Sequence, residues 1–436
     1  MNRFLALVAA ATIWSLPVQA EIPITEVKSP GGITAWLVES HDIPFVALEL
    51  RFRGGGSLDT PEKAGAVNLM AGLLEEGAGD LDARGFAEAR DALAADFRFS
   101  AGTDAVAVSA RFLTESRADA VTLLRSALTE PRFDADAVER VRGQVLSSLR
   151  SAEKDPGTLA SRAFDALAFG AHPYALPLDG TLETVPALTR DDIAAAHRGA
   201  LARDRVHVAA VGDIGPEELG RLLDDLLSGL PETGAPLPGP ATVDLTRGIT
   251  VQEFLGPQSV IIFGHEGIPR HDPDFIPAYV ANEILGGGRF SARLMREVRD
   301  RRGLTYGVGS YLYTLASADL AMGQLSTANA TAGAAIEVVR AEWDRIAEEG
   351  VTAEELEATK TYLTGSYPLR FDGNAPIARI LVGLQLLGYP IDYPAARNAM
   401  VEAVTLEDVN RAARRLFRPD NLRFVVVGAP EGLPQD

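Results

Sequence analysis

The sequence contains no cysteine and only six histidines among its 436 residues. The absence of cysteine excludes disulfide bonds, thiolate zinc sites, iron–sulfur clusters and a cysteine nucleophile. A transition-metal site would therefore need histidine together with Asp or Glu. No two of the six histidines are four residues apart, because the nearest pair, His265 and His271, is separated by six. We therefore expect no self-contained zinc site of the kind that two histidines form on one helical turn.

The chain also has little positive charge, with 41 Lys and Arg against 60 Asp and Glu and a net charge of −19. Such a negative field repels phosphate backbones, so nucleic acid is not an expected partner. Residues 21–436 contain no apolar run of about 18 residues, so we expect no transmembrane helix there.

The first twenty residues have the features of a cleavable signal peptide. Arg3 supplies the positive start, residues 4–16 form a short apolar stretch, and Ala20 ends the segment with a small residue. We expect a mature chain that begins near Glu21 and a destination in the periplasm or outside the cell.

Two segments of the chain repeat each other. LTRDDI (188–193) is followed by VHVAAVG (206–212), and VTLEDV (404–409) is followed by LRFVVVG (422–428), with 23 residues from Thr to Gly in both copies. Each copy predicts a helix that begins after a Thr N-cap and then a strand that ends at Gly. Upstream, residues 134–149 and 352–367 correspond at nearly the same offset and predict amphipathic helices.

An offset near 216 residues indicates two homologous domains in tandem. A segment with four prolines, residues 231–248, predicts the linker between them. We expect domains at residues 21–230 and 249–436, each of the α+β class, with an antiparallel sheet and helices packed on one face. AVAVSARF (105–112) and SVIIFGHEG (259–267) are two of the predicted strands.

The segment from Asn282 to Tyr313 is the most informative part of the sequence. It contains three consecutive glycines and then six arginines against two acidic residues between positions 289 and 302. We expect a helix to begin near Ser291, with Leu294, Met295 and Val298 facing inward. Composition alone favours a solvated basic helix face, and a tight turn accounts for the glycines better than a phosphate site does, because no Gly-Lys-Ser/Thr follows.

This segment resembles the C-terminal domain of the pitrilysin/insulinase family of metallopeptidases, which includes mitochondrial processing peptidase. The resemblance rests on NEILGGGRFS, the arginine that follows it at 299, and GLTY at 303–306. It covers essentially the whole mature chain and implies two homologous domains of antiparallel strands backed by helices. In that family an Arg and a Tyr seven residues apart bind substrate, and Arg299 and Tyr306 have this spacing.

The resemblance also implies where zinc would bind. Active members carry H-x-x-E-H on a helix of the N-terminal domain, and the corresponding helix here is residues 62–77. Alignment at Gly65 puts Asn68, Ala71 and Gly72 at the three positions, and none of them can supply the zinc ligands or the base. The distal acidic ligand is expected around residues 144–150, where Ser147 and Ser148 stand instead.

The sequence therefore predicts a non-catalytic, substrate-binding subunit of a periplasmic heterodimeric zinc metallopeptidase. A homologous partner with an intact H-x-x-E-H would bind the zinc, and this chain would bind no cofactor of its own. Peptide would add as a strand at a sheet edge, which we place near residues 101–112. The alternatives are a stand-alone zinc-less scaffold or peptide-binding protein of the same fold, and a bilobed solute-binding protein with parallel sheets.

Overall fold

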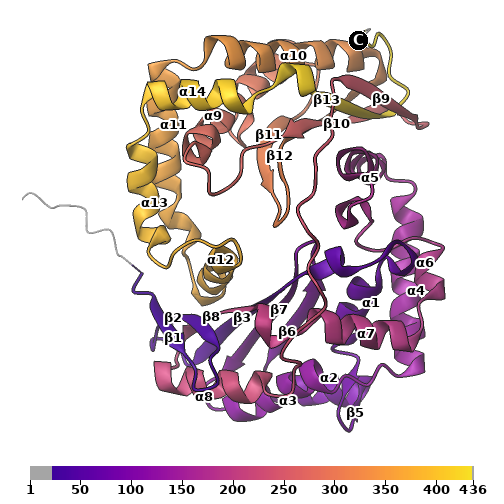
Figure 1. Cartoon of the computed structure of the whole chain (residues 1–436), viewed down its shortest axis with the longest axis vertical. Coiled ribbons are helices and arrows are strands. Elements are labelled where there is room, and N and C mark those ends of the chain that lie inside the picture. The colour runs from indigo at the N-terminus through magenta and orange to yellow at the C-terminus, as the bar shows by residue number, and fades with distance from the viewer. Residues whose placement is uncertain (1–21, 435–436) are drawn as a thin grey trace, which may run out of the picture.

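The protein is built around two β-sheets (Figure 1). A computed structural model describes residues 22–434, and the predicted signal peptide, residues 1–20, lies outside the described residues. The first sheet has the order β1-β2-β8-β3-β7-β6 and the second has the order β11-β12-β10-β13-β9. The strands of the first sheet are β1 Thr25–Lys28, β2 Thr34–Glu39, β3 Phe45–Arg53, β6 Asp96–Ala101, β7 Ala105–Leu113 and β8 Val206–Gly212. Those of the second are β9 Gly248–Glu253, β10 Gln258–Glu266, β11 Val308–Thr314, β12 Asp319–Ala328 and β13 Arg423–Gly428.

The second sheet repeats the topology of the first. Strands β2, β8, β3, β7 and β6 correspond in spatial order to β9, β13, β10, β12 and β11. The helix before β8 begins after a capping box at Thr189, and the helix before β13 begins after a capping box at Thr405. In each box the Thr hydroxyl and an acidic side chain three residues later satisfy backbone N–H groups that a helix start leaves unpaired. The tandem repeat that the sequence predicts is thereby confirmed.

Each sheet is antiparallel, as predicted, except for one parallel strand pair that the sequence did not predict. β2 pairs with β8, and β13 pairs with β9, in parallel register. Parallel neighbours need a long crossover connection, and here the two strands of each pair lie far apart in the sequence. Their relative direction depends on how the intervening helices return the chain, which local alternation does not encode.

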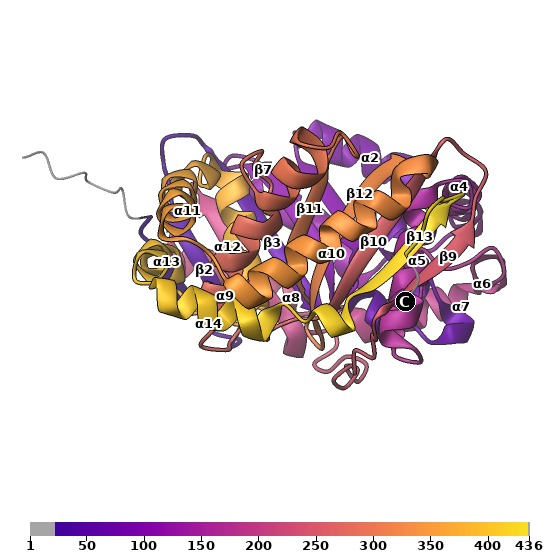
Figure 2. The same cartoon turned by 90° about the horizontal axis from the view of Figure 1, so that it is seen from above.

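Helices cover one face of each sheet, as predicted, and Figure 2 shows α10 lying across the second sheet. In the first half the helices are α1 Ala66–Leu73, α2 Ala83–Ala92, α3 Arg117–Thr129, α4 Ala135–Ala152, α5 Pro156–Phe169, α6 Thr184–Ala187, α7 Arg190–Ala200 and α8 Pro216–Leu227, with a small hairpin of β4 Gly77–Ala78 and β5 Leu81–Asp82. In the second half they are α9 Phe275–Gly286, α10 Ala332–Glu349, α11 Ala353–Ser366, α12 Asn374–Leu386, α13 Tyr393–Glu402 and α14 Leu406–Leu416. None of these helices is long and apolar enough to cross a membrane.

The opposite face of each sheet is covered by a helix from the other half of the chain (Figure 1). Phe164 of α5, which is fully buried, packs in one cluster with strands β10, β12 and β13 of the second sheet. Leu381 of α12, also fully buried, packs in a cluster with β2, β3 and β8 of the first sheet. Burial of one such side chain contributes roughly 2 kcal/mol, so this exchange of helices joins the two halves firmly.

A set of hydrogen bonds adds a polar connection between the halves. The hydroxyl of Tyr174 donates to Asp104 Oδ1 (2.6 Å), and both residues belong to the first half. The loop between β11 and β12 contributes two backbone donors. Ser317 N donates to the Tyr174 hydroxyl (3.0 Å), and Ala316 N donates to Asp104 Oδ2 (2.7 Å). These four residues, which we call the clasp, tie the end of the second sheet to the first half.

Candidate functional site

Arg299 and Tyr306, which the sequence predicts to bind substrate, contact each other at the surface of the second half. The guanidinium carbon of Arg299 lies 5.0 Å from the ring centre of Tyr306 and 4.8 Å from that of Phe290. Both rings are exposed, Tyr306 at 88% and Phe290 at 68% of their surface. Cation–π attraction to two rings restricts the guanidinium to a small region. Arg299 and Tyr306, seven residues apart in the sequence, are therefore in contact in the structure.

The polar atoms of this pair are available to an external ligand. Among residues 22–434, no acceptor takes a hydrogen bond from the Arg299 guanidinium, and the Tyr306 hydroxyl also has no hydrogen-bond partner. A guanidinium offers a fork of N–H donors that fits a carboxylate or a peptide carbonyl. A tyrosine hydroxyl can donate to an oxyanion that develops on an attacked carbonyl.

A π-helix, Met295–Asp300, carries Arg299. Its wide turn shows in the bond from Arg301 N to Arg296 O (2.9 Å), which spans five residues. The helical stretch begins at Arg293, two residues later than expected, and Leu294, Met295 and Val298 are buried as predicted. Turns of this type are rare in proteins, and a large share of those that occur lie at functional sites. Sequence periodicity cannot reveal such a turn, because the apolar pattern also fits an ordinary helix.

Acidic partners neutralise the basic segment around Arg299. Arg293 is buried and pairs with Glu355 (2.6 Å), while Arg301 and Arg302 both lie 2.9 Å from the buried Glu297. Burial would raise the pKa of Glu297, but the hydrogen bond from Arg302 and the neighbouring positive charges outweigh it and lower that pKa. The segment is therefore more than a solvated basic face, since part of it is an ion-pair network that includes the buried Arg293 and Glu297 and supports the exposed site.

The zinc-motif positions of α1 carry no ligating arrangement. Asn68 donates to Asp179 Oδ1 (3.1 Å), Ala71 is 1% exposed, and Gly72 is exposed at the surface. A Cβ added to Gly72 would lie 3.3 Å from Val141 Cγ1, so α4 passes close to this position. Helix α1 is thus beside the helix that was expected to supply the distal ligand.

Helix α1 is shorter than the predicted helix at residues 62–77. It runs only from Ala66 to Leu73, because Gly65 adopts a left-handed conformation (φ 91°) immediately before it. Asp59 accepts hydrogen bonds from Gly65 N (2.8 Å) and Val67 N (3.2 Å) and so stabilises the start of the helix. Burial raises the pKa of Asp59 to about 7, although these backbone bonds oppose the effect.

The expected position of the distal metal ligand is also without an acid. Ser147 and Ser148 are exposed on α4, in the helix predicted to carry that ligand. In residues 22–434 no group of three or more His, Cys, Asp or Glu side chains is placed to hold a metal ion. This finding is compatible with a chain that binds no catalytic metal.

The peptide-binding edge predicted at residues 101–112 was wrong. Strand β7, Ala105–Leu113, lies inside the first sheet between β3 and β6, and the edge on that side is β6, Asp96–Ala101. The edge strand carries charges, since Asp96 pairs with Arg98 (3.4 Å) and Arg111 (2.7 Å). Charged side chains are typical of sheet edges that must not aggregate. The alternation in residues 105–112 predicts a strand but contains no information about its neighbours.

Phe290 is the site residue that the sequence analysis missed. The signal was present, since an aromatic residue stands between Arg289 and Ser291, directly after the glycine turn. Its role is visible only in three dimensions, because the guanidinium that it contacts is nine residues further along the chain.

Comparison with known protein families matches two models in tandem. "Insulinase (Peptidase family M16)" matches residues 35–182, and "Peptidase M16 inactive domain" matches residues 187–363. The boundary between the models lies before β8, although β8 belongs to the first sheet.

The chain is also similar to individual proteins over most of its length. It is 27% identical over 390 residues to the "Non-peptidase homolog YmxG" of Helicobacter pylori, covering 89% of this chain and 90% of that protein. It is 28% identical over 399 residues to the "Uncharacterized zinc protease SCO5738" of Streptomyces coelicolor, covering 88% and 85%. A crystal structure titled as the peptidase M16 inactive domain from Pseudomonas fluorescens superposes with a TM-score of 0.86 at 29% identity, covering 95% of this chain and 99% of that one.

Proposed function

The chain belongs to the insulinase family (peptidase family M16), and from this premise we propose that it is the non-catalytic subunit of a heterodimeric zinc metallopeptidase. One observation carries the proposal. The chain presents Arg299 and Tyr306 with their polar atoms free, while helix α1 offers Asn68, Ala71 and Gly72 in place of zinc ligands and base. A binding pair without a metal site makes chemical sense when another chain brings the metal.

In this proposal a homologous partner with H-x-x-E-H contributes the zinc and the base that activates its water. Arg299 would hold a carbonyl of the bound peptide, and Tyr306 would donate to the oxyanion formed when water attacks. Phe290 would keep Arg299 in place before substrate arrives, which reduces the ordering cost of binding. Because the sequence begins with a predicted signal peptide, we place the heterodimer in the periplasm.

The decisive experiment is to co-express this chain with a homologue from the same genome that contains H-x-x-E-H. We expect about one zinc per heterodimer, peptide hydrolysis by the pair, and none by this chain alone. Tyr306→Phe keeps the ring and removes the hydroxyl, so kcat should fall about a hundredfold, as on loss of one oxyanion donor. The single variant Arg299→Ala should lose most of the activity of the wild-type heterodimer.

The matched control is Arg414→Ala, which removes an exposed arginine on α14, remote in sequence from the site. It should leave hydrolysis unchanged. Zinc-dependent hydrolysis by this chain purified alone would contradict the proposal. A stable complex whose rate of peptide hydrolysis is unchanged by both Arg299→Ala and Tyr306→Phe would favour the scaffold alternative.

A further inference from the structure

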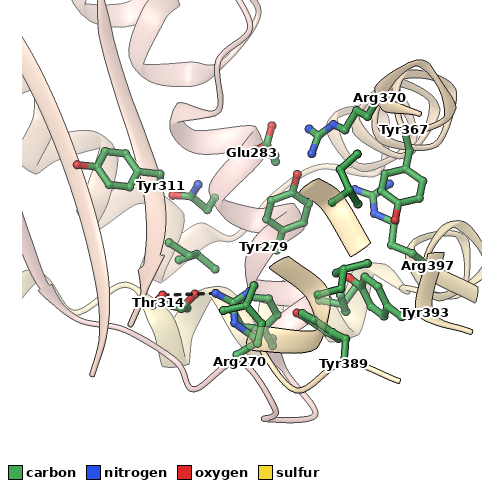
Figure 3. A pocket seen from close by; sticks show the side chains of 17 residues that line it. Arg270, Tyr279, Glu283, Tyr311, Thr314, Tyr367, Arg370, Tyr389, Tyr393 and Arg397 are labelled. Carbon is green, nitrogen blue, oxygen red and sulfur yellow. Dashed lines mark hydrogen bonds between the residues drawn. The ribbon is translucent and has the colours of Figure 1, made fainter. Parts of the chain in front are cut away.

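A cavity of about 330 Å³ lies in the second half of the chain (Figure 3), and neither Arg299 nor Tyr306 lines it. Its walls come from α9, from strand β11 and from the segment that includes α12 and α13. Its volume is at the small end of the range of natural ligand pockets. It therefore has room for a group of the size of one or two amino-acid residues.

Three arginines that line this cavity form no salt bridge within the described residues. Among residues 22–434, no carboxylate lies within 4 Å of the guanidinium nitrogens of Arg270, Arg370 or Arg397. Arg270 donates only a long bond to Thr314 O (3.5 Å), and Arg397 donates to the backbone carbonyl of Leu363 (2.8 Å). In a protein with a net charge of −19, arginines that form no salt bridge are suited to an anion from outside the chain.

The cations are spread over the cavity. In the view of Figure 3, Arg270 lies at one end and Arg370 at the other, with the ring of Tyr279 between them. Arg397 stacks on the ring of Tyr367, with its guanidinium carbon 4.6 Å from the ring centre, which holds it in place. Arg370 is exposed and donates no side-chain hydrogen bond within the described chain, so it is free to take a ligand.

The rest of the lining is apolar or aromatic. Tyr389 and Tyr393 stack with ring centres 4.0 Å apart, and the remaining apolar walls include Phe275, Leu384 and Leu387. Such surfaces favour a flat or bulky hydrocarbon group over a fully hydrated one. A ligand that satisfies both features has an anionic end joined directly to an apolar body.

One acidic side chain, Glu283, also faces the cavity. Burial raises its pKa, while the charges of Arg289, Arg370 and Arg397 oppose that rise. A carboxyl group in the wall disfavours a doubly charged phosphate more than a singly charged carboxylate. The lining therefore favours a singly charged carboxylate over a doubly charged phosphate.

We propose that this cavity binds the C-terminal residue of a peptide, with its carboxylate on Arg370 and an aromatic or large aliphatic side chain against the tyrosines. An arginine fork donates two parallel hydrogen bonds to a carboxylate, and a terminal carboxamide cannot accept both of them. The peptide as source rests on the proposed function, in which this chain holds peptide, whereas the carboxylate chemistry rests on the cavity alone.

The test uses the mature chain without any partner subunit. Calorimetric titration would compare an N-acetylated hexapeptide ending in phenylalanine as the free acid with the same peptide as the carboxamide. We expect the acid to bind and the amide to bind at least about tenfold more weakly, since a charged hydrogen bond is worth about one power of ten or more. Arg370→Gln should reproduce the tenfold loss for the acid and leave the amide unchanged.

Arg414→Gln is the matched control, because it removes an exposed arginine on α14 that does not line the cavity. Equal binding of acid and amide, or equal effects of the two substitutions, would overturn the carboxylate site. N-acetylphenylalanine tests the source of the carboxylate: binding as tight as that of the hexapeptide would overturn the peptide as the ligand. The binding test contains no partner subunit. A negative result would therefore overturn the cavity as a peptide site without contradicting the proposal that hydrolysis by the heterodimer depends on Arg299.

Discussion

His265 offers a quantitative test of the packing in the second half. It is fully buried on β10, where its Nε2 accepts a hydrogen bond from Trp343 Nε1 (2.9 Å) and its Nδ1 faces the carbonyl of Glu266 (2.7 Å). The ring is therefore neutral, with its proton on Nδ1. Burial lowers the pKa of His265 from 6.5 to about 4, an effect that the bond to Glu266 opposes and the charge of Arg418 reinforces.

The sign of the pH effect follows from proton binding. Between pH 6.5 and about 4 the unfolded chain holds a proton on this histidine and the folded chain does not, so stability falls as pH falls. A tenfold difference in proton affinity is worth about 1.4 kcal/mol, and the whole displacement is worth roughly 3 kcal/mol. At pH 4.5 we expect about 2.5 kcal/mol of this to have been lost relative to pH 7.

The substitution His265→Gln removes the titrating group and keeps an acceptor for Trp343. Urea unfolding at pH 7 and pH 4.5, followed by the fluorescence of the buried Trp36 and Trp343, gives the free energy of unfolding of each protein. The loss of stability on acidification should be smaller in the variant by about 2.5 kcal/mol, whatever its stability at pH 7. The exposed His271→Gln should behave as the wild type. If His265→Gln loses as much stability as the wild type does, the buried neutral histidine is refuted.

Three further predictions concern the joint between the halves, the support of the site and the site itself. Tyr174→Phe removes two hydrogen bonds of the clasp and should lower the free energy of unfolding by about 2 kcal/mol, while Tyr362→Phe, at an exposed ring, should change it little. Glu355→Gln leaves the buried Arg293 without its counter-charge and should cost about 3 kcal/mol in a urea titration; an unchanged midpoint would contradict the network. Phe290→Ala should raise KM of the heterodimer about fivefold with little change in kcat, since it removes one of two rings that hold the guanidinium; a selective loss of kcat would argue against this positioning role.

The sequence predicts the parts of this molecule that depend on local order. Thr189 and Thr405 identify homologous helices because capping is a property of a few consecutive residues, and both capping boxes form. The contact of Arg299 with Tyr306 is also close in sequence, so the family spacing was enough to find it. What the sequence could not predict is non-local.

Three non-local features illustrate this limit. The parallel pairing of β8 with β2 joins segments more than 160 residues apart. The edge position of β6 depends on the order of the other strands. The exchange of α5 and α12 between the halves has the same cause, since the apolar faces of these helices do not reveal which sheet they cover.

Helix α1 shows why this fold does not need a metal at the zinc-motif positions. The side chains of Val67, Leu69 and Met70 are at most 1% exposed and pack in the main cluster of the first half. The first and last zinc-motif positions, Asn68 and Gly72, lie on the partly and fully exposed side of the same helix. Burial of apolar area drives the folding of the helix, and ligand positions on the opposite side contribute little to it. The helix can therefore fold without a metal at these positions.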